Sequence, residues 1–195
     1  MTWLKTNSYT ITKMLLNQFG IMLLGIILVN SLTAKLPQLS IIASLYTTIF
    51  FMYLLYVMTW EQGAKDRIRA DNGSMRLDRL CGLKLSLFAN IPNFLIVLCL
   101  LIGFLFGSCL AQHAWAQGMF GIAHTIAIGW ESMYTGFINT ILHPETTSSM
   151  SVGYLIAYAL APIPPLAAST LGYIMGSHNK RLFGFLGSKN NNKQA

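Results

Sequence analysis

Residues 39–60 read LSIIASLYTTIFFMYLLYVMTW, an apolar block that contains no Asp, Glu, Lys or Arg. A helix needs roughly 20 such residues to cross the hydrocarbon core of a bilayer. Met14–Thr33, Ile91–Ser108 and Val152–Gly176 also lack charged side chains and reach or approach this length. The sequence therefore predicts four transmembrane helices, over about 14–33, 39–60, 84–108 and 152–176.

The composition of the whole chain is typical of a membrane protein. Of its 195 residues 54% are hydrophobic, 10% are charged, and the mean hydropathy is +0.54, whereas a soluble domain has about 25% charged residues. We therefore expect an all-α integral membrane protein, with residues 1–181 as one polytopic domain and 182–195 as a basic, flexible tail. The first helix is expected to be retained, and cleavage as a signal peptide is the alternative.

The positions of Lys and Arg predict the orientation of this bundle. Short loops rich in these residues stay on the cytoplasmic side, and four crossings would place every Lys and Arg except Lys35 on one face. The connection over 109–151 contains neither residue type. We expect both termini to be cytoplasmic, in a bacterial cytoplasmic membrane.

The charged segment 61–83 is predicted to form a cytoplasmic helical hairpin. Glu61 and Lys65, and likewise Arg67 and Asp71, stand four residues apart and can pair along one helix face. The Asp-Asn-Gly that follows is a turn signal, and leucines after it recur at helical spacing. A solvated, internally paired loop is the favoured interpretation, and a docking surface for a cytoplasmic partner is the alternative.

The outer connection 109–151 is apolar in its centre but is interrupted by glycines and carries His124 and Glu131. A single further crossing would place the C-terminal tail outside and violate the charge asymmetry. We therefore predict an interfacial or re-entrant helical segment, and two tight crossings are the alternative.

Two stretches are candidates for a ligand-binding element. Asn90 and Asn93 flank a proline where the third span begins, and amides in lipid must face other helices or water. The last span contains Pro162, Pro164 and Pro165, which cannot continue an undisturbed helix. Broken helices at the bilayer midplane often form binding sites, while a helix start and a structural kink are the plainer interpretations.

Small residues predict where helices approach closely. Gly103 and Gly107 stand four apart in the third span, and Ala168, Gly172 and Gly176 repeat this spacing in the last span. Packing within one chain is the expected role, with contact between subunits as the alternative.

Enzyme motifs are not found in this sequence. The three cysteines have no paired spacing, and His113, His124, Glu131, His143 and Glu145 match no metal signature. We expect no metal or cofactor, and a membrane enzyme using His124 and Glu131 is a minor alternative. The net charge is +7, but the basic residues flank the apolar spans and do not form one surface for nucleic acid.

The sequence therefore predicts a small multi-pass membrane protein in contact with the lipid bilayer. An accessory or structural subunit, assembled with other membrane subunits or with itself, is the favoured function. The alternative is a small transporter or channel-like protein for a neutral solute, an ion or a lipid, with its site at the broken last helix.

Overall fold

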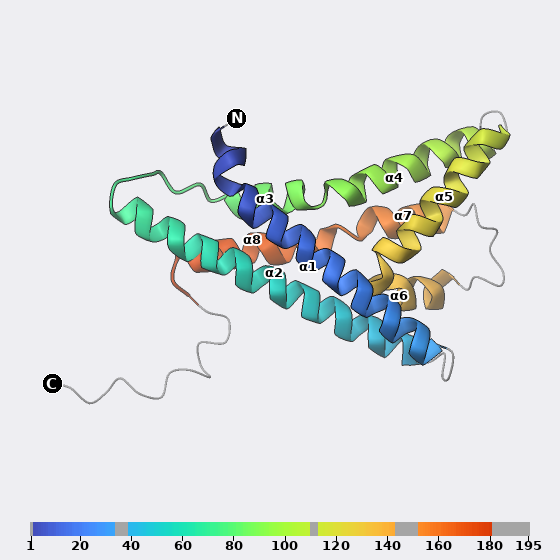
Figure 1. Ribbon diagram of the computed structural model, residues 1–195, viewed down its shortest axis with the longest axis horizontal. Coiled ribbons are helices and arrows are strands. Elements are labelled where there is room, and N and C mark those ends of the chain that lie inside the picture. The colour runs from blue at the N-terminus through green and yellow to red at the C-terminus, as the bar shows by residue number, and fades with distance from the viewer. Residues whose placement is uncertain (1, 34–38, 110–112, 143–151, 181–195) are drawn as a thin grey trace.

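The computed structural model describes residues 2–33, 39–109, 113–142 and 152–180, and every regular element in these ranges is helical (Figure 1). The predicted tail 182–195 and part of the outer connection lie outside the described residues. In chain order the elements are α1 (Thr2–Thr33), α2 (Leu39–Asp71), α3 (Cys81–Ala89), α4 (Ile91–Phe104), the π-helical turn η1 (Leu105–Cys109), α5 (Ala114–Trp130), α6 (Ser132–Leu142), α7 (Val152–Leu160) and α8 (Ile163–Ser177).

Three helical segments are long and apolar enough to cross a membrane: Trp3–Leu28, Leu39–Asp71 and Val152–Ser177. A fourth is present if Cys81–Ala89 and Ile91–Gly107, which meet at 54°, count as one bent span. The expected all-helical fold is therefore confirmed among the described residues, with three or four helices of spanning length.

The helix boundaries differ from those predicted at the first two spans. α1 begins at Thr2 instead of near residue 14, and α2 continues past residue 60 to Asp71. Helices can extend beyond an apolar block because charged residues such as Lys and Arg have good helix propensity. Hydropathy alone located the apolar parts of these helices but not their ends.

The structure contains the first arm of the hairpin predicted for the charged segment 61–83, but the second helix begins only at Cys81. Its first arm is the end of α2, where Arg67 Nε lies 2.9 Å from an Asp71 carboxylate oxygen. A turn follows, in which Gly73 takes a φ of +72° that suits glycine. The expected second arm is wrong before Cys81, because residues 76–78 are not helical.

The predicted pairing of Glu61 with Lys65 is also wrong. The ion pairs within the described ranges join Arg67 to Asp71, Arg69 to Asp66 and Lys84 to Asp78. Glu61 and Lys65 are both exposed on α2. An exposed pair of this kind gains little net free energy, so helical spacing permits it without requiring it.

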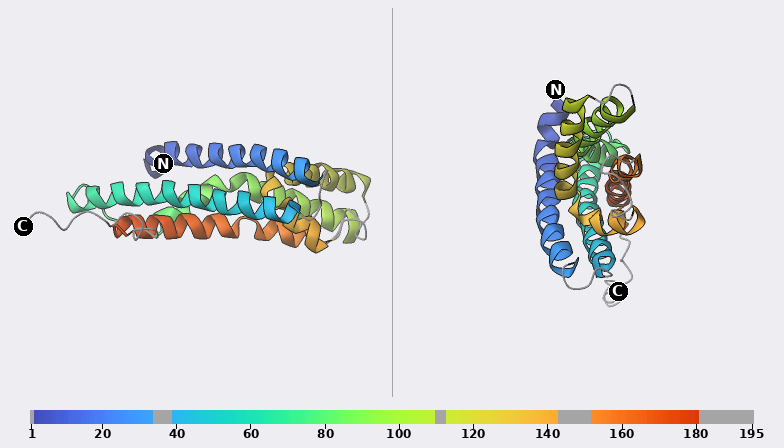
Figure 2. Two further views of the ribbon diagram at one scale, coloured as in Figure 1. Left: turned by 90° about the horizontal axis from the view of Figure 1, so that it is seen from below. Right: turned by 90° about the vertical axis from the view of Figure 1, so that its right-hand side faces the viewer.

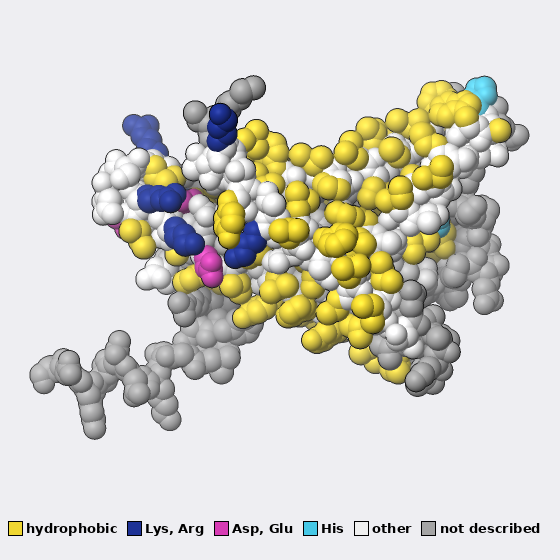
Figure 3. All heavy atoms as spheres, viewed as in Figure 1, with side chains coloured by type: hydrophobic (Ala, Val, Ile, Leu, Met, Phe, Trp, Pro, Cys, Tyr) yellow, Lys and Arg dark blue, Asp and Glu magenta, His cyan; other side chains and the backbone are white. Residues whose placement is uncertain are grey.

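The helices lie lengthwise beside one another, and the bundle has two different ends (Figures 1 and 2). At the basic end α2 ends and α3 begins, and Lys and Arg side chains gather there (Figure 3). The end of α2 and the turn after it contain Lys65, Arg67, Arg69, Arg76 and Arg79. At the far end α1 ends and α2 begins. The largest helix interface joins α2 to α8 along the bundle.

The outer connection contains a helical hairpin that begins and ends at the far end (Figure 1). α5 runs back along α4 toward the middle of the bundle, with Phe120 against Gly103 and Trp130 near Asn93. α6 then returns toward the start of α2. The helical segment predicted for the outer connection is thus two helices, α5 and α6, and neither is among the helices of spanning length.

Many large apolar side chains face outward and several polar side chains are buried between helices, as expected of a bundle in lipid. Large apolar side chains cover the outside, including Leu16 and Ile27, each 65% exposed (Figure 3). Ser44, Thr47 and Thr59 are fully buried between helices. Such a surface is costly in water and favourable in hydrocarbon, so the apolar helices indicate a membrane protein.

Candidate functional site

Asn90 and Asn93 lie at the bend between α3 and α4, and both are buried in the protein. Asn93 donates through Nδ2 to Asn90 Oδ1 at 2.9 Å, and Asn90 donates to the Ser86 carbonyl oxygen at 2.8 Å. From α1, Gln18 donates to Asn93 Oδ1 at 2.9 Å. From α5, the Trp130 indole N–H donates to the same oxygen.

This amide network accounts for two polar side chains that sequence alone left unexplained. The oxygen of Asn93 accepts from two other helices, so its amide connects α1, α4 and α5. Buried amides with such partners stabilise helix contacts in lipid. The arrangement is a closed set of hydrogen bonds between helices, and the two pockets described below are not lined by these asparagines.

The proline cluster lies at the junction of α7 and α8. Pro162 is the residue before α8, and Pro164 and Pro165 occupy its first turn, where the missing backbone N–H is tolerated. The two helices together form one segment of spanning length, Val152–Ser177. Neither of the two pockets described below is lined by Asn90, Asn93, Pro162, Pro164 or Pro165, although Pro92 lines one of them.

The predicted small residues lie where helices meet. A Cβ added to Gly103 would lie 2.8 Å from the Cβ of Phe120 on α5. Gly172 and Gly176 of α8 lie against the backbone of α2 at Tyr56 and Trp60. The neighbouring small residues Gly107 and Ala168 are also buried in the protein.

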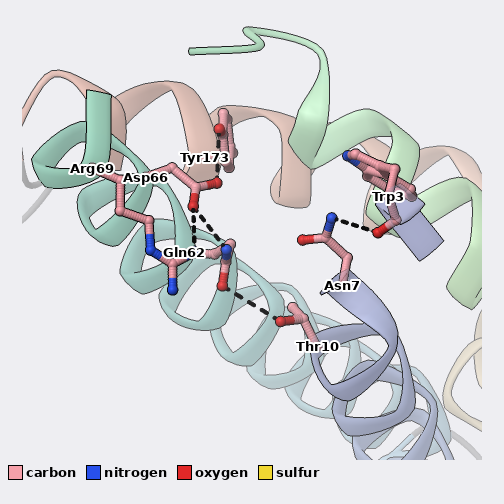
Figure 4. A network of polar contacts seen from close by, with 7 residues as sticks. All are labelled: Trp3, Asn7, Thr10, Gln62, Asp66, Arg69 and Tyr173. Atoms are coloured by element: carbon pink, nitrogen blue, oxygen red, sulfur yellow. Dashed lines mark hydrogen bonds and ion pairs between the residues drawn. The ribbon is translucent and has the colours of Figure 1, made fainter. Parts of the chain in front are cut away.

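Asp66 is a buried acid that the sequence interpretation missed. It lies on α2 and is only 3% exposed, so the expectation of a solvated loop is wrong for this residue. Tyr173 on α8 donates its hydroxyl proton to Asp66 Oδ2 at 3.1 Å, and Gln62 Nε2 donates to Oδ1 at 3.0 Å (Figure 4). Arg69 Nη1 lies 3.7 Å from Oδ1.

A pocket of about 300 Å³ opens beside this acid at the basic end. It lies between the first turns of α1, the end of α2 and the start of α3. Its wall carries both signs of charge, which suits a polar ligand held by charge-assisted hydrogen bonds. The polar residues that define it are Thr6, Asn7, Asp66, Arg69, Arg76, Asp78 and Tyr173.

A second ion pair lies at the entrance of α3. Lys84 donates through Nζ to Asp78 Oδ2 at 2.6 Å, and the backbone N–H of Leu80 donates to Asp78 Oδ1 at 3.0 Å. The hydrogen bond from Lys84 is the main reason why the pKa of Asp78 lies below its usual range. Both side chains are exposed, so the pair fixes local geometry more than stability.

Glu131 occupies the junction of α5 and α6 and is 2% exposed. The junction is tied to the neighbouring helices, because Ser132 donates its hydroxyl proton to the Met22 carbonyl oxygen of α1 at 2.7 Å. Thr48 of α2 donates to the Met133 carbonyl oxygen at 3.4 Å. The α5–α6 hairpin therefore holds a carboxyl group inside the bundle, far from the basic end.

Three buried polar atoms around this junction have no hydrogen-bond partner among the described residues: Glu131 Oε2, the Tyr134 hydroxyl and His124 Nε2. The His124 ring meets the Tyr154 ring edge-on at 4.9 Å and the Tyr158 ring at 5.9 Å. Buried polar atoms without partners are rare in proteins and indicate a bound water or ion, or a functional group.

In the sequence, His124 and Glu131 were noted only as the acid and base of an alternative enzyme function. Their seven-residue spacing puts His124 and Glu131 on one face of a helix, and this was the available signal. Nothing in the local sequence showed that α7 would place Tyr154 and Tyr158 beside His124. Within the described residues no group of three or more His, Cys, Asp or Glu could hold a metal ion.

No protein-family model, curated protein or solved structure matches this chain.

Proposed function

We propose that this chain is a small membrane transporter or channel-like protein whose central element is the α5–α6 hairpin. The observation that supports it is the buried Glu131 at the tip of a hairpin that enters the bundle from one end only. Non-spanning helices at membrane depth are tolerated where they are enclosed in protein or line a cavity. An acid in that position is expensive and is typically part of an ion or solute pathway.

The small-residue spacings, the charged segment 61–83 and the lack of enzyme motifs favoured an accessory subunit, and the lack of an acid or a base in the apolar blocks was an objection to transport. That reasoning placed Glu131 in an outer loop. In the folded chain this carboxyl is surrounded by α1, α2, α5 and α6, which removes the main objection to transport. By the distribution of Lys and Arg, the basic end faces the cytoplasm and the α5–α6 hairpin opens to the opposite side.

Flux measurements on purified protein in liposomes test this proposal. Liposome shrinkage and swelling would follow glycerol and urea as neutral solutes, and dye-loaded liposomes would follow protons and K⁺. We expect flux of at least one probe above that of protein-free liposomes. A clear reduction of this flux in Pro165→Ala or Glu131→Gln would assign the substituted residue to the pathway. Permeability equal to that of empty liposomes for all four probes would contradict the proposal.

One observation favours the accessory-subunit alternative. An apolar groove of about 560 Å³ runs between α1 and the bend of α3 and α4, lined by Leu4, Ile11, Leu15, Phe88, Ile91 and Pro92. A helix of a partner subunit would bury this groove. Purification in mild detergent, followed by measurement of the mass of the complex, distinguishes the two functions, because a stoichiometric partner protein supports the subunit and a chain recovered alone supports transport.

A further inference from the structure

We propose that the pocket at the basic end binds a small zwitterion, whose primary ammonium group contacts Asp66 and Asn7 and whose phosphate group lies between two arginines. The pocket is lined by residues of α1, α2, α3 and α8 and of the turn before α3, and no residue of α5 or α6 lines it. A ligand here would be additional to any solute moved by the α5–α6 hairpin, so this site goes beyond the proposed function.

Asp66 is the most buried of the charged residues that line the pocket, at 3% exposed. Its Oδ1 accepts a hydrogen bond from Gln62 at 3.0 Å, and its Oδ2 accepts one from Tyr173 at 3.1 Å. An ionised carboxylate has about four acceptor sites, so about two remain on a group that bulk water hardly reaches. Because Asp66 lines the pocket, a donor placed in the pocket can occupy them.

Asn7 adds a second acceptor from another helix. Its Nδ2 donates to the Trp3 carbonyl oxygen at 3.0 Å, and its side-chain oxygen lies on the side of the amide that faces Asp66 (Figure 4). Asn7 is 7% exposed, so its amide is also nearly closed to bulk water. A primary ammonium group has three N–H donors and can bind the carboxylate and this oxygen together. A quaternary ammonium group has no N–H donor and cannot.

Arg69 and Arg76 supply the positive charge of the pocket. Both side chains are exposed whereas Asp66 is buried, so the guanidinium groups stand nearer to water than the carboxylate. Arg69 Nη1 lies 3.7 Å from Asp66 Oδ1, which is longer than a hydrogen bond. Arg76 takes part in none of the ion pairs within the described ranges. Both arginines therefore keep N–H donors for a phosphate, whose oxygens can accept from two guanidinium groups at once.

The arrangement of these charges selects a ligand that carries both signs. The two acids in the wall would repel a simple anion, and the two arginines would repel a simple cation. Asp78 is already paired with Lys84, which leaves Asp66 as the acid available to an ammonium group. Among the described residues no group of three or more His, Cys, Asp or Glu could hold a metal ion. A zwitterion with its ammonium group inward and its phosphate outward is complementary to both signs of charge.

The volume of the pocket limits the ligand to a small group. About 300 Å³ lies at the lower end of the range for ligand pockets, which is roughly 300–1,000 Å³. A phosphoethanolamine group joins the required ammonium and phosphate through a short chain. This group occurs free in solution and as the headgroup of a phospholipid, and both sources present the same chemistry to the pocket.

Isothermal titration calorimetry of the full chain, purified in an uncharged maltoside detergent, tests the site. We expect O-phosphoethanolamine to bind saturably. Three related probes each lack one feature: ethanolamine lacks the anion, inorganic phosphate lacks the ammonium group, and phosphocholine lacks the N–H donors. Each should bind at least about tenfold more weakly, because hydrogen bonds to a charged group are lost. The absence of saturable binding, or an equal affinity for any of the three probes, would overturn the proposal.

Two pairs of variants locate the ligand. Arg76→Gln removes a guanidinium group of the pocket and should weaken binding at least about tenfold, whereas Arg79→Gln removes an exposed arginine nearby that does not line the pocket and should not. Asp66→Asn should also weaken binding, and Asp71→Asn on the same helix should leave it unchanged. If Asp66→Asn does not fold, the two arginine variants still decide the outcome. Equal affinities in Arg76→Gln and Arg79→Gln overturn the assignment.

Nanodiscs distinguish the two sources of the group. In phosphatidylcholine nanodiscs O-phosphoethanolamine should bind as it does in detergent, and a loss of binding there would contradict the need for N–H donors. Adding phosphatidylethanolamine should weaken its apparent affinity if the lipid headgroup enters the pocket, and should not if only the free molecule does; either result keeps the site and identifies its ligand. Solute flux without this binding would remove the site and keep the proposed function, and binding without flux would do the reverse.

Discussion

Asn93 connects three segments of the chain through one side chain. Its oxygen accepts from Gln18 of α1 and Trp130 of α5, and its nitrogen donates to Asn90. Asn93 is 1% exposed, so water cannot replace these bonds if the amide is removed. The free energy of unfolding therefore depends on this residue more than its polar character in the sequence suggests.

Asn93→Ala is expected to lower the free energy of unfolding by about 1–3 kcal/mol, because buried donors lose their acceptor. Thermal unfolding in detergent, followed by circular dichroism, measures the change. The matched control is Asn139→Ala, which removes an exposed amide from α6 and should shift the midpoint little. Equal shifts in the two variants would show that the network does not stabilise the bundle.

Asp66 gives a second test at a single residue. Asp66→Asn keeps the shape of the side chain but leaves one acceptor oxygen for the donors Tyr173 and Gln62, so one of them is unpaired. We expect a loss of about 1–3 kcal/mol. Asp71→Asn removes the exposed pair with Arg67 and should cost no more than about 1 kcal/mol. Urea or heat unfolding of both variants measures the difference, and a larger loss in Asp71→Asn would contradict the structure.

At the scale of elements, the interface of α2 with α8 depends on small residues in both helices. Gly172 and Gly176 of α8 face the α2 backbone, and Gly63 of α2 faces Tyr173 and Ser177. The spacing of the α8 glycines was visible in the sequence. Gly63 was not noted, because it stands among charged residues that suggested a solvated arm.

Gly176→Ala is expected to destabilise the bundle by about 1–3 kcal/mol, since its Cβ would lie 2.8 Å from the Trp60 carbonyl carbon. Gly121→Ala, on the open side of α5, has no atom within 4 Å of the added carbon. This control should be neutral or stabilise by up to about 1 kcal/mol through helix propensity. Unfolding in detergent compares the two, and a neutral Gly176→Ala would mean that α2 and α8 separate easily.

The bend between α3 and α4 is a helix boundary, and Pro92 in the sequence predicted a helix start there. Pro92 occupies the first turn of α4, and the residue before that helix is Asn90. A proline here starts a helix without losing a hydrogen bond. The bend of 54° itself depends on packing, because α3 is held against α8 and α4 against α5.

At the scale of the whole molecule, the proposed orientation predicts which residues are accessible from each side of the membrane. In a background with the three native cysteines replaced by alanine, Ser74→Cys at the basic end should react with an impermeant maleimide only after the cells are opened. Ala114→Cys at the start of α5 should react in intact cells. Labelling of both from the same side would contradict this orientation and the distribution of charge on which it rests.

The sequence by itself determined the class of fold and much of its helical content. Apolar blocks, the turn at Gly73 and the prolines that begin α4 and α8 are local signals, because hydropathy and backbone preference are properties of neighbouring residues. The tertiary structure alone decided which polar groups became a site. Asp66 meets Tyr173 across 107 residues, and Glu131 is buried only because the α5–α6 hairpin turns back into the bundle. A buried polar group needs a partner from another helix, and no local pattern shows which helix will supply it.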